Sequence, residues 1–206
     1  KDWDINIYRG VLTGYNDAFI ISTEKRNEIL VNCQTEDERI RTAELIRPIL
    51  RGRDVKRYGY DWAGLWLINA HNGLKSKGIK PVDINDYPAI KEWLDNGGVA
   101  YNGKMYKGFS QIEKRSDRGD TPYNLRNCAY MEDFSKPKIV WGNLNLTASY
   151  AMVQDNSFIN APSPVIVPAS KFLLAVLNSK LADYYIRQLG VTRNGGYFEY
   201  KPMFVE

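Results

Sequence analysis

The sequence predicts an α+β fold in which mixed or antiparallel sheet elements pack with helices. Short apolar runs with strand character stand well apart along the 206 residues, and helical patterns lie between them without a regular βαβ repeat. The hydrophobic share of 44% and the charged share of 25% are ordinary for a folded protein. The length suffices for one sizeable domain or for two small lobes that share a core, and we predict a single domain over residues 1–206.

The first third of the chain predicts two strands, a helix and a further strand. Residues 5–22 read as two short strands around the segment 10–16, the second strand consisting of Phe19-Ile20-Ile21. Thr35 and Glu38 have the spacing of a capping box, which predicts a helix that includes Ile46 and ends near Pro48. Residues 65–68 form an apolar run typical of a buried strand.

The remainder of the chain predicts one helix, a long loop, two β regions and a helical pair. A helix begins near Pro88 and stops at Gly97-Gly98, and residues 97–130 read mainly as loop. Residues 138–141 predict a strand, and residues 150–167 a β-rich stretch. The apolar spacing of residues 170–189 is helical, divided at Asn178-Ser179 with Asn178 as the expected cap. Gly190 ends this region.

Positive charge is unevenly distributed along the chain. The net charge is only +4, but residues 41–60 hold six Lys or Arg against two acids, and residues 104–126 hold six against three. Such segregation can build one basic face that attracts a nucleic acid. Two ordinary solvated surfaces explain the same distribution equally well.

Other features bear on the cellular setting. The two cysteines, Cys33 and Cys128, lie far apart without metal-ligand spacing, and no apolar run approaches the roughly 20 residues of a membrane helix. No signal peptide opens the sequence, so we expect a cytoplasmic protein that does not enter a membrane. The sequence begins without Met and stops soon after Pro202, and we expect it to be a fragment of a longer chain.

Several segments, taken in order, resemble the TaqI-like C-terminal specificity domain. They are RGVLTGYNDAFII at 9–21, ILRGRDVKRY at 49–58, YPAIKEWL at 87–94, RSDRGDTPYNLR at 115–126, and KPKIVW at 136–141 with LNSKL at 177–181. The resemblance implies a target recognition domain of an adenine-specific DNA methyltransferase or of a single-chain type II restriction–modification enzyme. It implies a DNA-methylase specificity-domain fold that binds double-stranded DNA opposite a catalytic domain of the same parent chain.

The resemblance also implies that the fragment itself performs no catalysis. A methyltransferase of this type needs an Asn/Asp-Pro-Pro-Tyr/Phe motif and a Gly-rich loop for S-adenosylmethionine, and neither occurs in the sequence. The fragment therefore has no cofactor of its own, and S-adenosylmethionine is expected to bind the parent's missing domain.

Eleven residues are the candidate DNA contacts. Asn can pair with adenine through two hydrogen bonds, Arg with guanine, and basic side chains with phosphates. Gly14 lets Tyr15 and Asn16 project from a turn, although a routine turn explains them too. The other candidates are Arg51, Arg53, Lys56 and Arg57 as phosphate clamps, the cluster of Arg115, Arg118, Tyr123 and Arg126, and Arg193 in a Gly-rich loop.

The Arg115–Arg126 cluster has a structural interpretation of equal weight. Asp117 could hold one arginine in place, and an ion-paired loop that braces the fold would have the same composition. We interpret Arg118 rather than Arg115 as the base-reading residue, because Gly119 frees its backbone and Arg115 can pair with Glu113. Phosphate clamping by the 51–57 segment has its own alternative, which is neutralisation by Asp54.

Two other function classes remain open. A metal-dependent nuclease would use Glu199 and Lys201, which have the Glu-x-Lys spacing, with Asp183 as a second carboxylate. The lone His71 lies beside Asn72-Gly73 and reads as a loop residue. A protein-interaction domain would use the abundant aromatics, fourteen Tyr and five Trp, as its binding surface.

Overall fold

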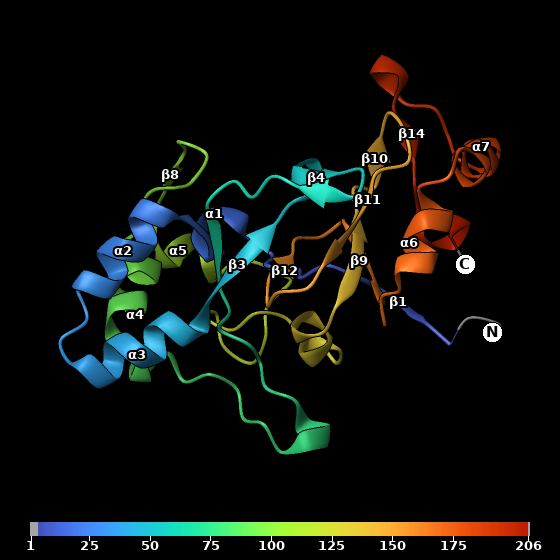
Figure 1. The fold of residues 1–206 in the computed structure, drawn as a ribbon. Helices are drawn as coiled ribbons and strands as arrows, with labels where there is room; N and C mark the ends of the chain where they lie inside the picture. Colours follow the sequence, from blue (N-terminus) through green and yellow to red (C-terminus); the bar gives the residue numbers. More distant parts are fainter. Residues whose placement is uncertain (1–3, 206) are drawn as a thin grey trace. The chain divides into compact units, whose positions relative to one another are not determined.

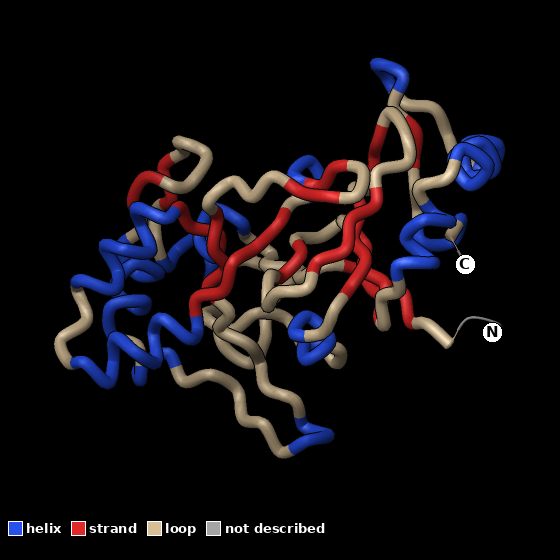
Figure 2. The backbone as a smooth tube through the Cα atoms, viewed as in Figure 1, coloured by secondary structure: helices blue, strands red, loops and turns tan. Residues whose placement is uncertain are grey.

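The computed structural model describes residues 4–205, and its contacts divide the chain into two units (Figure 1). Unit 1 consists of residues 4–11, Leu50–Ala63 and 130–205, and unit 2 of Leu12–Ile49 and Gly64–Ala129. Small sheets and short helices alternate without a βαβ repeat, which confirms the predicted α+β class (Figure 2). No helix within this described part is both long and apolar enough to span a bilayer.

Three neighbouring strands of one sheet lie at the centre of unit 2, in the order β3 (Ile46–Leu50), β6 (Leu65–Ile68) and β2 (Ile20–Ser22). Both neighbouring pairs of these strands are antiparallel. Leu67, at the middle of the central strand, is fully buried. Helices α2 (Thr23–Val31), α3 (Glu36–Leu45) and α4 (Pro88–Asn96) belong to the same unit. The Trp93 indole of α4 donates to the Ala18 carbonyl over 2.8 Å, which joins this helix to the segment before β2.

Two boundaries in unit 2 differ from the prediction. Phe19 ends a single helical turn, α1 (Asn16–Phe19), and the strand starts only at Ile20. Ile46 opens β3 instead of closing α3, because Pro48 disfavours a helical conformation for the residue before it. The capping box predicted at Thr35 is present in part, since its hydroxyl accepts from the Glu38 amide over 3.1 Å. The helix at Pro88 ends at Gly97 as predicted.

Unit 1 contains a four-stranded antiparallel sheet. The strand order is β1 (Asn6–Arg9), β13 (Pro164–Val167), β9 (Lys138–Trp141) and β11 (Tyr150–Val153). All of β9 is buried, so this strand lies in the core as its apolar run predicts. The core residues Trp141, Tyr150 and Tyr200 pack with the buried side chains of α6 (Lys171–Leu177) and α7 (Lys180–Leu189).

The predicted division between α6 and α7 is correct, but the cap is a different residue. The Ser179 hydroxyl accepts from the Ala182 amide over 3.1 Å and is the N-cap of α7. Asn178 instead ends α6 and is only 2% exposed. Its amide is used inside unit 1, as described below.

The other elements are short. They are β4 (Val55–Lys56), β5 (Gly59–Tyr60), β7 (Gly98–Val99), β8 (Met105–Tyr106), α5 (Phe109–Ile112), β10 (Leu144–Asn145), β12 (Phe158–Ile159), β14 (Phe198–Glu199) and the 3₁₀ turns η1 (Gly52–Asp54), η2 (Lys75–Lys77), η3 (Ile84–Asp86), η4 (Met131–Ser135), η5 (Asn194–Gly196) and η6 (Pro202–Phe204). Most of residues 97–130 is loop, as predicted. Cys33 and Cys128 are partly buried.

Candidate nucleic-acid interface

A buried arginine organises the loop after α5 in unit 2. The Arg115 side chain is 7% exposed, and its guanidinium lies 4.3 Å from the centroid of the Phe19 ring. It donates hydrogen bonds to four backbone carbonyl groups, those of Thr13, Asp117, Pro122 and Asn124. Burial lowers the pKa of Arg115 to about 10, so the group stays charged at neutral pH. Arg115 therefore braces the loop from inside and ties it to the turn at Thr13.

Close backbone approaches hold the loop against its neighbours. A Cβ atom on Gly14, whose φ is +68°, would lie 2.4 Å from the Asp117 carbonyl oxygen. A Cβ on Gly119 would lie 2.4 Å from the side-chain oxygen of Asn72, which also accepts from the Asp120 amide over 2.7 Å. No larger residue fits at either glycine, and Arg115 bonds to the Thr13 carbonyl, so residues 13–16 pack closely against residues 115–126. We call these two segments the recognition cluster.

Three candidate contacts stand on the exposed side of the recognition cluster. Asn16 is exposed, and its side-chain oxygen accepts from the Thr13 hydroxyl over 2.6 Å. Arg118 is exposed and donates to the Glu113 carbonyl over 3.1 Å. Arg126 pairs with the Asp117 carboxylate over 2.9 Å, so the arginine that Asp117 holds is Arg126. Weak anchors of this kind orient a side chain and release it at small cost.

The two tyrosines of the cluster are partly buried supports. The Tyr15 ring lies 5.8 Å from the Tyr106 ring, and Tyr15 is the N-cap residue of α1. The Tyr123 hydroxyl donates to the Asp95 carboxylate over 2.6 Å, and burial raises the pKa of Tyr123. Both rings contribute to the framework that carries Asn16 and Arg118.

A second basic surface lies in unit 1 on the β4–β5 hairpin. Arg51 pairs with the buried carboxylate of Asp54 over 2.7 Å, which fixes the turn η1 in front of the hairpin. Arg53, Lys56 and Arg57 are exposed. The Lys56 ammonium donates to the Arg53 carbonyl over 3.2 Å. We call residues 53–58 the basic hairpin.

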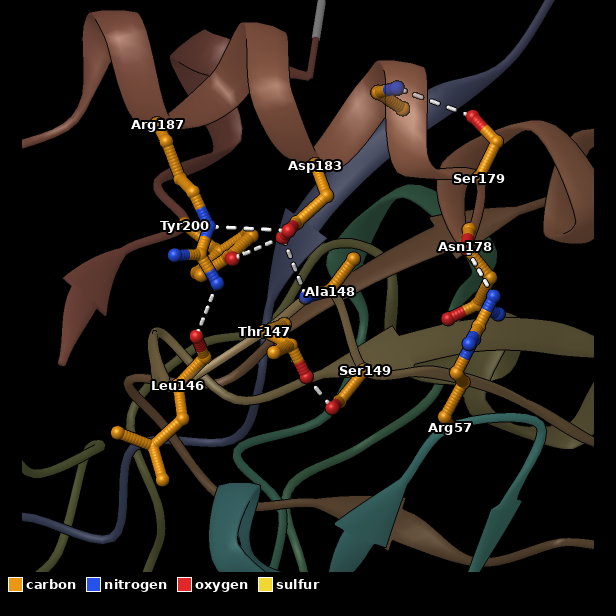
Figure 3. A network of polar contacts seen from close by, with 11 residues as sticks. Arg57, Leu146, Thr147, Ala148, Ser149, Asn178, Ser179, Asp183, Arg187 and Tyr200 are labelled. Carbon is orange, nitrogen blue, oxygen red and sulfur yellow. Dashed lines mark hydrogen bonds and ion pairs between the residues drawn. The ribbon is translucent and has the colours of Figure 1, made fainter. Parts of the chain in front are cut away.

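Asn178 connects the basic hairpin to the sheet of unit 1. Its side-chain amide accepts from the Tyr150 N–H over 3.0 Å and donates to the Tyr150 carbonyl over 2.9 Å. Its backbone carbonyl accepts from Arg57 over 2.8 Å (Figure 3). The sequence motif at 177–181 draws attention to Asn178, but only the structure shows that it anchors Arg57.

The two carboxylates that a metal-dependent nuclease would use, Asp183 and Glu199, form ion pairs within the fold. The Asp183 carboxylate pairs with Arg187 over 3.0 Å and accepts from the Ala148 amide over 2.7 Å (Figure 3). Glu199 pairs with Lys201 over 2.5 Å and with Arg193, and these cations hold the pKa of Glu199 below its usual value. Between residues 4 and 205, no three His, Cys, Asp or Glu side chains are grouped so that they could hold a metal.

The remaining sequence expectations concern His71 and Arg193. His71 lies in a loop of unit 2, accepts from the Gly73 amide over 3.1 Å, and has a pKa lowered by burial. Arg193 is exposed but directed to Glu199 by a 2.6 Å hydrogen bond. The His71 carbonyl accepts from Asn124 of the recognition cluster over 3.4 Å, whereas Arg193 lies in unit 1 outside the basic hairpin.

Comparisons with known proteins identify a matching family and a similar fold. The model of the TaqI-like C-terminal specificity domain matches residues 47–206, well over half of the chain. The structure of the Type IIL restriction-modification enzyme MmeI in complex with DNA has a similar fold, with a TM-score of 0.60 and 13% identity. That match covers 95% of this chain and 23% of the MmeI chain, so the chain spans about a quarter of that enzyme's length. No curated protein matches the sequence.

Proposed function

Because the chain belongs to the family of TaqI-like C-terminal specificity domains, we propose that it recognises a short sequence in duplex DNA for an adenine-N6 methyltransferase or a restriction–modification enzyme. The observation that carries the proposal is the recognition cluster. Its loop is locked from inside by Arg115 while Asn16 and Arg118 stay exposed. A rigid frame with exposed Asn and Arg tips suits base recognition, since each side chain matches one purine in the major groove.

We divide the candidate residues into readers, which contact base edges, and clamps, which contact phosphates. Asn16 and Arg118 read base edges, and Arg126, oriented by Asp117, belongs to the same loop as Arg118. Arg53, Lys56 and Arg57 bind phosphates, because each is exposed on one short hairpin. Arg51 and Arg115 are left out of the DNA contacts, since their guanidinium groups hold buried Asp54 and backbone carbonyls.

The proposal also assigns the chemistry to a catalytic domain elsewhere in a longer parent chain. S-adenosylmethionine would bind there, and the parent would methylate adenine with or without endonuclease activity. Support comes from the MmeI match, in which this fold covers only 23% of a restriction-modification enzyme. We expect the parent sequence to contain an Asn/Asp-Pro-Pro-Tyr/Phe motif upstream of this chain. A parent without methyltransferase motifs would contradict this assignment.

Unit 1 offers a surface for that catalytic domain. The α7 side chains Leu181, Tyr184 and Tyr185 are 78%, 65% and 60% exposed. Large exposed apolar side chains grouped on one helix are typical of a protein contact. We therefore assign this face to the catalytic domain.

Salt dependence of DNA binding tests the proposed function. We expect the chain to bind duplex DNA at low salt, with an affinity that falls steeply as salt rises because phosphate contacts release counterions. Arg57→Ala should make the slope of log affinity against log salt less steep by about 0.9, the value for one lost phosphate contact. Fluorescence anisotropy titrations at several salt concentrations measure both quantities.

A matched variant controls for general loss of positive charge. Arg39, on α3, is 51% exposed and paired with Glu36, so Arg39→Ala should leave the slope unchanged. Absence of binding at low salt, or an affinity insensitive to salt, would contradict the proposed function and favour a protein partner.

A further inference from the structure

Tyr58 occupies an unusual backbone conformation at the tip of the basic hairpin. β4 and β5 are joined by the two residues Arg57 and Tyr58, with Lys56 paired to Gly59 across the hairpin. Tyr58 has a φ of +66°, in the left-handed region that Gly or Asn ordinarily occupies at such a turn. For a bulky side chain this conformation costs free energy that the fold must offset.

The contacts of unit 1 among the described residues do not explain why position 58 carries an aromatic side chain. The Tyr58 side chain is 53% exposed, and its ring lies 5.3 Å from the guanidinium of its neighbour Arg57. The Tyr58 N–H donates to the Tyr150 carbonyl over 2.8 Å, but a glycine would donate the same hydrogen bond. The backbone contact therefore explains the turn and leaves the ring unexplained.

Hydrogen bonds of the two neighbouring side chains hold the hairpin that carries the Tyr58 ring. Arg57 donates to the Asn178 carbonyl over 2.8 Å on one side. The Tyr60 hydroxyl donates to the Asp155 carboxylate over 3.0 Å on the other. An aromatic side chain has about two rotatable bonds, so it loses little entropy on binding, which is why such residues serve well as binding anchors.

The surroundings of the ring indicate the ligand. Arg53, Lys56 and Arg57 lie within five positions of Tyr58 and are all exposed. A DNA strand alternates charged phosphates with apolar deoxyribose rings, so a flat apolar surface among cations matches it in both respects.

We propose that Tyr58 is a DNA-contacting residue whose ring packs on a deoxyribose of the strand held by Arg53, Lys56 and Arg57. This inference rests on the proposed function and adds to it a contact that carries no charge. Its ligand is the sugar–phosphate strand, so the contact contributes affinity to every duplex alike.

Tyr58→Gly tests the inference, because glycine suits the left-handed backbone and removes only the ring. We expect its melting temperature to be no lower than that of the wild type. We expect its affinity for duplex DNA to fall about five- to tenfold, which corresponds to the low end of the loss found for the stacking of a base on an aromatic side chain. The salt slope should stay unchanged, unlike that of Arg57→Ala, because no charge is removed.

Two further variants complete the experiment. Tyr58→Phe keeps the ring face and should bind within about twofold of the wild type. Phe172→Ala removes an exposed aromatic ring on α6 and should leave the affinity unchanged. If the wild type binds DNA and Tyr58→Gly binds equally well, or if Tyr58→Gly melts at a lower temperature, the inference is overturned. If the wild type does not bind at all, the proposed function itself fails.

Discussion

Replacing Arg115 by alanine is expected to lower the free energy of unfolding by about 3 kcal/mol or more. Four backbone carbonyls accept hydrogen bonds from this guanidinium, and the substitution leaves acceptors in the interior of unit 2 without a donor. Each unsatisfied buried group costs about 1–3 kcal/mol, and the loss of packing against Phe19 adds to this. Urea denaturation followed by fluorescence measures the change.

Two variants show whether the geometry of the guanidinium matters. Arg115→Lys should recover only part of the stability, because one ammonium cannot replace a planar fork that donates in several directions. Arg118→Ala, three positions away on the exposed side, should change the unfolding free energy by less than about 0.5 kcal/mol. An Arg115→Ala protein as stable as the wild type would show that the loop is not braced from within.

Arg118→Ala and Asn16→Ala are each expected to cost about 1–3 kcal/mol of binding free energy on the preferred DNA sequence and much less on others. A base-edge contact is made only with the matching base, so its loss lowers the ratio of specific to non-specific affinity. The clamp variant Arg53→Ala serves as the control and should lower both affinities alike, leaving that ratio unchanged. The measurement is the affinity for preferred and scrambled duplexes at one salt concentration.

The ratio of the two affinities shows whether Arg118 contacts a base or a phosphate. A lower affinity for both duplexes with an unchanged ratio would make Arg118 a phosphate clamp. Unchanged affinities would show that the exposed side of the cluster does not contact DNA, whatever the role of Arg115 inside it.

The sequence predicted those elements whose pattern is local. The apolar runs at residues 65–68 and 138–141 are strands with the expected bounds, because such strands are buried whatever they pair with. Pro88 and Gly97 mark the ends of a helix through their own backbone preferences. Helix α2 was not predicted, because its sequence is polar and Ile29 is its only buried residue among those described.

The candidate site could be predicted only in part, because burial is a tertiary property. Arg115 and Arg118 have similar neighbours in the sequence, yet one is 7% exposed and the other lies on the surface. One hydrogen-bond acceptor of Arg115 is the backbone carbonyl of Thr13, 102 positions away. Every residue has a backbone carbonyl, so the sequence does not indicate which of them accepts from Arg115. The role of Asn178 is hidden for the same reason, since it joins Tyr150 to Arg57 through backbone groups.

Selection from a pool of DNA duplexes with a randomised central segment tests most directly whether this chain reads sequence. The protein is incubated with the pool at moderate salt, bound duplexes are recovered and amplified, and the enriched pool is sequenced after several rounds. Our account predicts that one short motif dominates, and that selection with Arg118→Ala relaxes the preference at one position of it. Recovery of bound DNA without any shared motif would contradict the account, because the chain would then bind only the backbone.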